Sequence, residues 1–259
     1  MPRHATGQAL GALVRSECQA IIDALRAPTA VHVRVHEARK AIRRARALLA
    51  LVEDGGGGFD VGPAERILQR LGDGLSRLRD AHAAVETARS LAVQEGRKAW
   101  RPVIEALRER SNTLAARELA RDPGFARRQS IVEGALHYLD AQPWGTLRAT
   151  HLRAGLQRQR RRVERAARRA RKDPGPDNLH RWRRRVRRLR MQLDALPQLG
   201  RGRHSPKASR SLHQLSDALG RQQDLQVLAG LLRRQPGIPA RAALQRRLRE
   251  LSSPSPEVT

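Results

Sequence analysis

Cysteine is almost absent from this chain of 259 residues, and Cys18 has no partner for an intramolecular disulfide. The absence of disulfides is typical of a reducing compartment. Cys18 lies in an apolar helical pattern, so we interpret it as a small core residue and not as a nucleophile. No stretch approaches the roughly 18 apolar residues of a transmembrane helix, and no signal peptide is visible. The sequence therefore predicts a soluble, cytoplasmic protein without a membrane partner.

Aromatic residues, lysines and strand patterns are also scarce. Only four of the 52 basic residues are lysines, and the acidic residues number 25, which leaves a formal net charge of +27. A high-GC genome inflates arginine, alanine and glycine together and explains part of this excess, but not its placement. A surplus of this size predicts an anionic partner. The planar guanidinium group of arginine suits bidentate contacts with phosphate.

Apolar residues follow helical spacing along nearly the whole chain, and period-two alternation is almost absent. The sequence therefore predicts an all-α protein, with breaks at clusters of proline and glycine. We expect a loop at 54–62 and another at 200–206, and a disordered tail at 252–259 because it is rich in proline and serine. The predicted helices cover roughly 7–26, 31–53, 63–78, 80–94, a segment that ends near 120, 125–140, 146–172, 177–196, 206–219, 221–234 and 238–251.

A basic helix occurs twice in the chain. His36 of the first copy falls on His180 of the second at an offset of 144 residues, and five basic residues fall on basic residues. We therefore expect a single unit over 1–251, made of two repeats of about four helices at about 7–120 and 146–251, with a helical connection over 121–145. The match continues without a gap through Leu68, Leu71, Asp73, Leu75, Arg77 and Asp80, which align with Leu212, Leu215, Asp217, Leu219, Arg221 and Asp224.

Both copies predict an amphipathic helix with one basic face. At about 100° per residue, the cations of the first copy lie within a half-cylinder centred on His36. The opposite faces are apolar and consist of Ala38, Ile42, Ala45, Leu49 and Val52 in the first copy and Trp182, Val186, Leu189, Leu193 and Leu196 in the second. The candidate anion-binding residues are His36, Arg39, Lys40, Arg43, Arg44 and Arg46, and His180, Arg183, Arg184, Arg187, Arg188 and Arg190, with Arg77, Arg221 and the arginine-dense segment 158–171 as weaker candidates.

The like charges on these faces destabilise a free helix by a few tenths of a kcal/mol per pair, and a multivalent anion would relieve that repulsion. From His36 to Arg46 the basic face spans about 15 Å, which is long for one phosphate and suits a chain of phosphates. The competing interpretation is an unusually basic solvated face. We favour an anion-binding surface because the pattern occurs twice in register.

Catalytic and metal-binding patterns are weak in this sequence. His32 and His36 share a helix face, but too few further ligands are present for zinc, so we expect no metal and no cofactor. The repeated aspartates Asp73, Asp80, Asp217 and Asp224 could act as acids and bases. We favour a structural role for them, as a helix cap at Asp80 or as anchors for arginines. The glycines at 55–58 lack the Lys-Ser/Thr of a phosphate-binding loop, so we expect no enzyme activity.

The two basic helices resemble the motif of the CHAD family, the conserved-histidine α-helical domain. That motif is His36, Arg39, Arg43, Arg44 and Arg46 in one half and His180, Arg183, Arg187, Arg188 and Arg190 in the other. The family also carries Leu-Gly and Arg/Asn-Asp near the end of the next helix, matched by Arg79-Asp80 and by Leu219-Gly220 with Gln223-Asp224. Met191 stands where an aromatic residue often follows the second motif, and Ala45 stands for a usual leucine.

The resemblance covers about residues 7–251 and implies two four-helix bundles related by a pseudo-twofold axis. It also implies non-enzymatic binding of inorganic polyphosphate on a basic surface or central cavity that both basic helices line, and association with polyphosphate granules. If His36 and His180 contact phosphate, binding should be tighter at acid pH, since free imidazole titrates near pH 6.5. The alternative function is nucleic-acid binding. Against it, single-strand recognition usually relies on aromatic stacking, and no aromatic residue lies on the basic faces.

Overall fold

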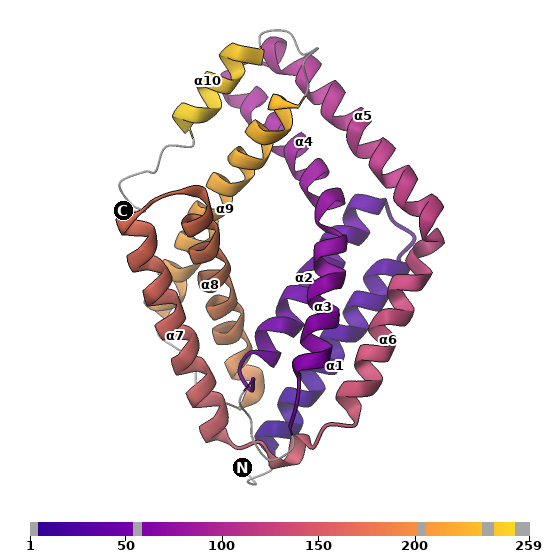
Figure 1. The fold of residues 1–259 in the computed structure, drawn as a ribbon, viewed down its shortest axis with the longest axis vertical. Helices are drawn as coiled ribbons and strands as arrows, with labels where there is room; N and C mark the ends of the chain where they lie inside the picture. The colour runs from indigo at the N-terminus through magenta and orange to yellow at the C-terminus, as the bar shows by residue number, and fades with distance from the viewer. Residues whose placement is uncertain (1–4, 54–58, 201–205, 235–240, 252–259) are drawn as a thin grey trace. The chain divides into compact units, whose positions relative to one another are not determined.

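A computed structural model describes residues 5–53, 59–200, 206–234 and 241–251, and within them the chain is helical without a strand (Figure 1). The prediction of an all-α fold is confirmed. The expected loop residues 54–58 and 201–205 and the expected disordered tail at 252–259 lie outside the described residues. The α-helices are α1 (Ala5–Arg26), α2 (Val31–Leu49), α3 (Gly62–Gly74), α4 (Ser76–Glu95), α5 (Arg97–Arg121), α6 (Ala126–Asp140), α7 (Ala149–Lys172), α8 (Pro176–Ala195), α9 (Pro206–Arg233) and α10 (Arg241–Leu251). Three short 3₁₀ helices are η1 (Pro123–Phe125), η2 (Trp144–Thr146) and η3 (Leu196–Leu199).

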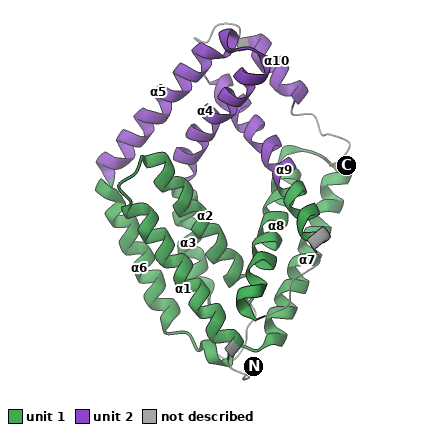
Figure 2. Ribbon diagram, turned by 180° about the vertical axis from the view of Figure 1, so that it is seen from behind, with its two compact units in different colours: residues 1–75, 122–216 green, residues 76–121, 217–259 purple. Residues whose placement is uncertain are grey.

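The chain forms two compact units, coloured separately in Figure 2. Unit 1 comprises Met1–Leu75 and Asp122–Ser216, and unit 2 comprises Ser76–Arg121 and Asp217–Thr259. Each unit therefore takes helices from both halves of the sequence, and this division does not follow the expected repeats at about 7–120 and 146–251. The duplication itself stays a prediction from the sequence.

Helix α2 is at the centre of unit 1, where it packs against α1, α3 and α8. Three alanines of α2, Ala38, Ala41 and Ala45, are buried, and their small side chains let the neighbouring helices pack close to it. Helix α1 packs on α6 as well as on α2, and α7 packs on α8. Two glycines of α1 approach η2, and a Cβ atom on Gly11 would come within 2.7 Å of the Trp144 ring. The packing of α8 on both α2 and α7 brings these three helices together in unit 1.

The amphipathic pattern predicted for the two basic helices is confirmed, with one difference. The apolar faces predicted for α2 and the segment after it are buried at every position. On α8, Trp182, Val186, Leu189 and Leu193 are also buried. Leu196 is only half-buried, because α8 ends at Ala195 and Leu196 begins η3. The first basic helix likewise ends at Leu49 and not near residue 53, and a turn follows it.

The two halves differ at the break between their third and fourth predicted helices. In the first half, α3 ends at Gly74, and α4 begins at Ser76. In the second half we expected a similar break near residue 220, but α9 runs without interruption from Pro206 to Arg233. Ala218 stands at the position equivalent to Gly74, and alanine is more favourable than glycine in a helix interior by about 1 kcal/mol. The second half therefore lacks the glycine at which α3 ends in the first half.

Unit 2 has its own apolar core, built from α4, α5, α9 and α10. Trp100, Val103 and Leu107 of α5 pack in one cluster with Leu228 of α9 and Leu248 of α10. Arg79 of α4 forms ion pairs with Asp80 at 3.0 Å and with Asp224 of α9 at 3.3 Å. The prediction that Asp80 caps a helix is therefore wrong, because it lies inside α4. The alternative, in which Asp80 and Asp224 anchor an arginine, is confirmed.

Candidate functional site

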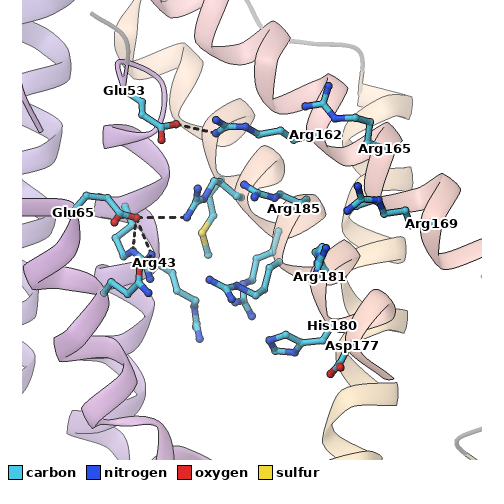
Figure 3. Close-up of a pocket in the computed structure, with 17 residues that line it drawn as sticks. Arg43, Glu53, Glu65, Arg162, Arg165, Arg169, Asp177, His180, Arg181 and Arg185 are labelled. Atoms are coloured by element: carbon cyan, nitrogen blue, oxygen red, sulfur yellow. Dashed lines mark hydrogen bonds and ion pairs between the residues drawn. The ribbon is translucent and has the colours of Figure 1, made fainter. Parts of the chain in front are cut away.

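A cavity of about 750 Å³ in unit 1 is lined mainly by arginine side chains (Figure 3). Ten arginines face three carboxylates in its wall. The arginines come from α2 (Arg43, Arg46), α7 (Arg162, Arg165, Arg169) and α8 (Arg181, Arg184, Arg185, Arg187, Arg188). The carboxylates are Glu53, Glu65 and Asp177, and the remaining lining residues are Gln69, Ala166, His180 and Met191.

Helical spacing explains why α8 supplies half of the arginines. His180, Arg184, Arg187 and Met191 recur every three or four residues and so lie on one side of the helix. Pro176 in the first turn fixes the start of the helix, and Asp177 places a carboxylate at its positive end. In Figure 3, His180 and Arg185 lie across the cavity from Arg43 and Glu65. The buried apolar face of α8 holds these side chains toward the cavity.

Glu65, in the first turn of α3, connects the two basic helices. Its Oε1 atom accepts hydrogen bonds from Nε and Nη2 of Arg46 at 3.0 and 2.8 Å. The same oxygen lies 3.9 Å from Nη2 of Arg188. Gln69, one turn further along α3, accepts a hydrogen bond from Nη2 of Arg46 at 3.1 Å. One carboxylate is thus shared by an arginine of α2 and an arginine of α8.

A second carboxylate, Glu53, binds an arginine of α7. Nη1 of Arg162 donates a hydrogen bond to Oε2 of Glu53 at 2.9 Å. Glu53 lies just after α2, so this ion pair joins the end of α2 to α7. Glu65 and Glu53 together pair with three arginines, and seven further arginines share the same wall, so these carboxylates offset only part of the guanidinium charge.

Burial, together with the crowding of positive charge, lowers the pKa of two arginines on α8. Burial, followed by the nearby charges of Arg46 and Arg185, lowers the pKa of Arg188 to about 10. Burial and the charges of Arg162 and Arg184 also lower the pKa of Arg185. Both side chains remain protonated at neutral pH, but their charged forms are disfavoured by their surroundings. An anion in the cavity would reverse this penalty.

The arginines of α7 stand where the first half of the chain has core residues. At the offset of 144 residues, Cys18 aligns with Arg162, Ile21 with Arg165 and Leu25 with Arg169. The three residues of α1 are completely buried, whereas the three arginines of α7 line the cavity. Equivalent positions therefore build an apolar interface in one half and a cationic wall in the other.

Comparison with known proteins identifies the family. A family model of the CHAD domain matches residues 5–233. The chain belongs to the CHAD domain family. The crystal structure of the CHAD domain from the plant Ricinus communis is similar to this CHAD domain, with a TM-score of 0.66 and 20% sequence identity over 96% of this chain and 86% of that chain. At this identity the match shows the fold alone, and no curated protein matches the chain.

The cavity includes about half of the residues that the sequence singled out in this CHAD domain. It brings together Arg43 and Arg46 of the first motif with residues of the second. The expectation that both basic helices line one cavity is thus confirmed in geometry, although their role in binding stays a prediction. The residues of the second motif in the lining are His180, Arg184, Arg187 and Arg188.

The other candidates of the first motif lie outside the cavity lining and contact other groups. Arg39 donates a hydrogen bond to the carbonyl oxygen of Gly72. Lys40 lies 3.3 Å from Glu37, and Arg44 donates to Glu17 of α1 at 2.6 Å. His36 is exposed, with Nε2 at 3.8 Å from Glu37. Arg183 and Arg190 of the second motif are half-buried outside the lining, and Arg77 and Arg221 are exposed in unit 2.

Sequence reasoning missed several residues of the cavity because it required matches in both copies. Arg181 and Arg185 align with Glu37 and Ala41, and so were left out of the candidate set. Glu65 aligns with Ser209, so it is not a residue that both halves share. The arginine-dense segment 158–171 was the only signal for the wall that α7 supplies. Glu53, Gln69 and Asp177 had no pattern that could have identified them.

Two further features of this CHAD domain bear on its chemistry. In the part of the chain that the structure describes, no group of three or more His, Cys, Asp or Glu residues could hold a metal ion. Among the same residues, no helix is long and apolar enough to cross a bilayer.

Proposed function

We propose that this CHAD domain is a non-enzymatic binding protein for inorganic polyphosphate, and that the cavity of unit 1 is its binding site. The observation that carries the proposal is the cavity lining, in which ten arginines on three helices face three carboxylates. The lowered pKa of Arg188 adds support, because burial, followed by the charges of Arg46 and Arg185, disfavours its charged form, and a bound phosphate would favour that form again. A chain of phosphates supplies many negative charges at short intervals and would neutralise several arginines at once.

Most of the affinity would come from charge neutralisation and the release of counterions. Guanidinium groups also bind phosphate oxygens in a bidentate manner, which fixes the direction of the chain of phosphates. The arginines come from different helices, so a single phosphate contacts only a few of them. A longer chain would gain contacts with each helix, and affinity should therefore rise with chain length.

Nucleic acid is the competing ligand. Its bases would need stacking surfaces or polar groups that read their edges. Among the described lining residues no aromatic side chain is present, and Trp182, the aromatic residue of α8, is buried on the opposite face. These observations favour a ligand made of phosphate alone.

Competition binding tests the proposal. The labelled ligand is long-chain polyphosphate at about 150 mM salt, where weak surface electrostatics is screened. The competitors are duplex DNA, RNA and heparin matched for charge. We expect a strong preference for polyphosphate, and we expect Arg43→Ala combined with Arg187→Ala to abolish it. Equal binding of all four polymers would support a generic cationic surface and would favour the nucleic-acid alternative.

A matched control removes the same charge elsewhere in unit 1. Arg127→Ala combined with Arg153→Ala replaces two exposed arginines that do not line the cavity. We expect this variant to retain nearly all of the affinity. In cells, the same proposal predicts that a fluorescently tagged chain collects at polyphosphate granules and that the Arg43/Arg187 variant does not.

A further inference from the structure

Unit 2 carries a second hollow, of about 610 Å³, between the end of α4 and the first turns of α5. Gly96, with φ of 104°, joins the two helices in a backbone conformation that side chains disfavour. This tight connection places both helices against each other along the hollow. We call it the α4–α5 groove, and its lining is Arg89, Ala92, Val93, Arg97, Lys98, Arg101, Ile104, Glu105 and Arg108. None of these residues lines the arginine cavity.

The centre of the α4–α5 groove is apolar and open to water. The Val93 side chain is 74% exposed, well above the other exposed large hydrophobic residues of the described chain, Val33 and Ile131, at 40% each. Ile104 is half-buried and packs on the core of unit 2, to which the buried Ala92 belongs. The floor of the groove is therefore the outer surface of that core. Covering such apolar surface favours association, because it removes apolar area from water.

The rim of the α4–α5 groove is cationic. Arg97, Arg101 and Arg108 recur at helical spacing along one side of α5, over about 16 Å. Arg101 is paired with Glu105 at 3.1 Å, whereas Arg97, Lys98 and Arg108 form no ion pair within the described residues. Arg89, on α4, pairs with Glu86 at 2.6 Å. The groove thus offers unneutralised positive charge along its α5 side, next to the apolar surface, whereas the cation on its α4 side is paired.

We propose that the α4–α5 groove binds an acidic amphipathic helix of a partner protein. A helix is convex, and its row of apolar side chains fits a hollow between two helices. Carboxylates beside that row would meet the unpaired cations that α5 contributes to the rim, Arg97, Lys98 and Arg108. This inference is independent of polyphosphate binding, since it concerns different residues in a different unit.

Other occupants fit the α4–α5 groove less well. An inorganic polyanion has no apolar part and would leave Val93 and Ile104 in water. A bilayer binds a continuous apolar face, whereas the apolar lining here is confined to Ala92, Val93 and Ile104. A second copy of this chain carries 52 basic and 25 acidic residues, so repulsion would dominate its approach. An acidic helix satisfies both the charge and the shape of the groove.

The test uses the full chain and a fluorescein-labelled peptide of about 16 residues, enough to span the rim with a turn at each end. Leucines lie on one face of this peptide at helical spacing, and glutamates flank them. A second peptide has the same composition in an order that gives no apolar face. In fluorescence anisotropy at about 150 mM salt, we expect the patterned peptide to bind at least about tenfold more tightly than the permuted one, a difference of 1.4 kcal/mol.

Variants locate the binding surface. Val93→Glu places a charge of the wrong sign on the exposed floor, and we expect it to weaken binding of the patterned peptide by at least about tenfold. Ile131→Glu makes the same kind of change at an exposed position of unit 1 and should leave binding unchanged. Arg97→Ala with Arg108→Ala should weaken binding and reduce its salt dependence. Arg43→Ala with Arg187→Ala, in the arginine cavity, should have no effect.

Three results would overturn the proposal. Equal affinity for both peptides would show that charge alone attracts them. An unchanged affinity in Val93→Glu would place the peptide elsewhere. If neither peptide binds while vesicles of mixed anionic and neutral phospholipids retain the chain in a Val93-dependent manner, the groove is a membrane contact.

Discussion

At the residue scale, Glu65 is a negative charge that the protein itself places among the cavity arginines. Its carboxylate is 26% exposed and holds Arg46 through two hydrogen bonds, with Arg188 nearby. A phosphate in the cavity would compete for the same guanidinium groups. Under the proposed function, Glu65 would stabilise the arginines in the absence of an anion and compete with phosphate for them, which gives one substitution two opposite effects.

The substitution Glu65→Gln keeps the shape of the side chain and removes its charge. Without an anion, we expect a loss of about 1 kcal/mol in the free energy of unfolding, seen as a fall in Tm of about 2–4 °C. The affinity for polyphosphate should rise about fivefold, because the internal competitor is gone. Thermal unfolding with and without polyphosphate, together with a binding titration, measures both effects. The matched control is Glu164→Gln, which removes an exposed carboxylate of α7 outside the cavity. If Glu65→Gln instead weakens binding, Glu65 positions the arginines and does not compete with the ligand.

The two motif histidines should differ in their contribution to pH dependence. His180 lines the cavity, beside arginines of α8 and one turn from Asp177, whereas His36 is exposed outside it. A protonated imidazole would add a positive charge to the cavity wall, and acid pH favours the protonated form. We expect polyphosphate to bind more tightly at pH 6 than at pH 8 in the wild type and in His36→Gln, and equally at both values in His180→Gln. The same pH dependence in all three proteins would exclude His180 as its source.

At the scale of the element, α2 and α8 have nearly the same pattern but different surroundings. Arg39, Lys40 and Arg44 of α2 are engaged by Gly72, Glu37 and Glu17. The equivalent residues of α8 line the cavity at two of three positions, Arg184 and Arg188. The duplicated motif therefore does not predict equal contributions from the two helices, and α8 should dominate binding.

Two triple variants compare the helices at equal loss of charge. We expect Arg184→Ala, Arg187→Ala and Arg188→Ala together to weaken polyphosphate binding far more than Arg39→Ala, Lys40→Ala and Arg44→Ala together. The slope of log affinity against log salt should fall by about 0.7–0.9 for each lost phosphate contact, and only the α8 variant should show this fall. Equal losses in both variants would indicate that net charge matters and the cavity does not.

Helix α7 depends on one glycine for its close approach to the turn after α2. A Cβ atom at Gly155 would overlap the backbone carbonyl of Leu51, which cannot rotate away. We expect Gly155→Ala to lower the free energy of unfolding by about 2–3 kcal/mol. Gly134→Ala is the control, because a Cβ atom at this position of α6 meets nothing within 4 Å. That variant should gain up to about 1 kcal/mol from helix propensity, and denaturant unfolding measures both values.

At the scale of the whole molecule, the sequence predicts the helices better than their division into units. Periodicity and the clusters of proline and glycine locate nearly every helix, because local propensity and the buried face agree. The continuous α9 could have been expected from Ala218, where the first half has Gly74. The two discontinuous units could not, because they arise from long-range packing. Local breaks at Gly74 and at Pro123-Gly124 lie beside two of their boundaries, but no local pattern shows which segments pack together.

The sequence predicts those residues of the candidate site that occur at equivalent positions in both halves of the chain. The motif identified Arg43 and Arg187, which occupy equivalent positions and both line the cavity. The wall from α7 was only a weaker candidate, through the arginine-dense segment 158–171, because Arg162 stands at a position that holds the buried Cys18 in the first half. Comparing the two halves for similarity finds shared residues, whereas this cavity also depends on positions at which the halves differ.

The location of the cavity within unit 1 leads to a prediction for the whole chain. Its lining comes from α2, α3, α7 and α8 and the turn after α2, all of which belong to unit 1. A ligand that bridges these helices raises the free energy of local opening for the backbone amides that it holds. In hydrogen exchange with and without polyphosphate, we expect slower exchange in peptides from these four helices. Peptides from α4 and α5, in unit 2, should exchange at the same rate in both samples. Equal protection of α4 and α5 would mean that polyphosphate binds a wider surface than the arginine cavity.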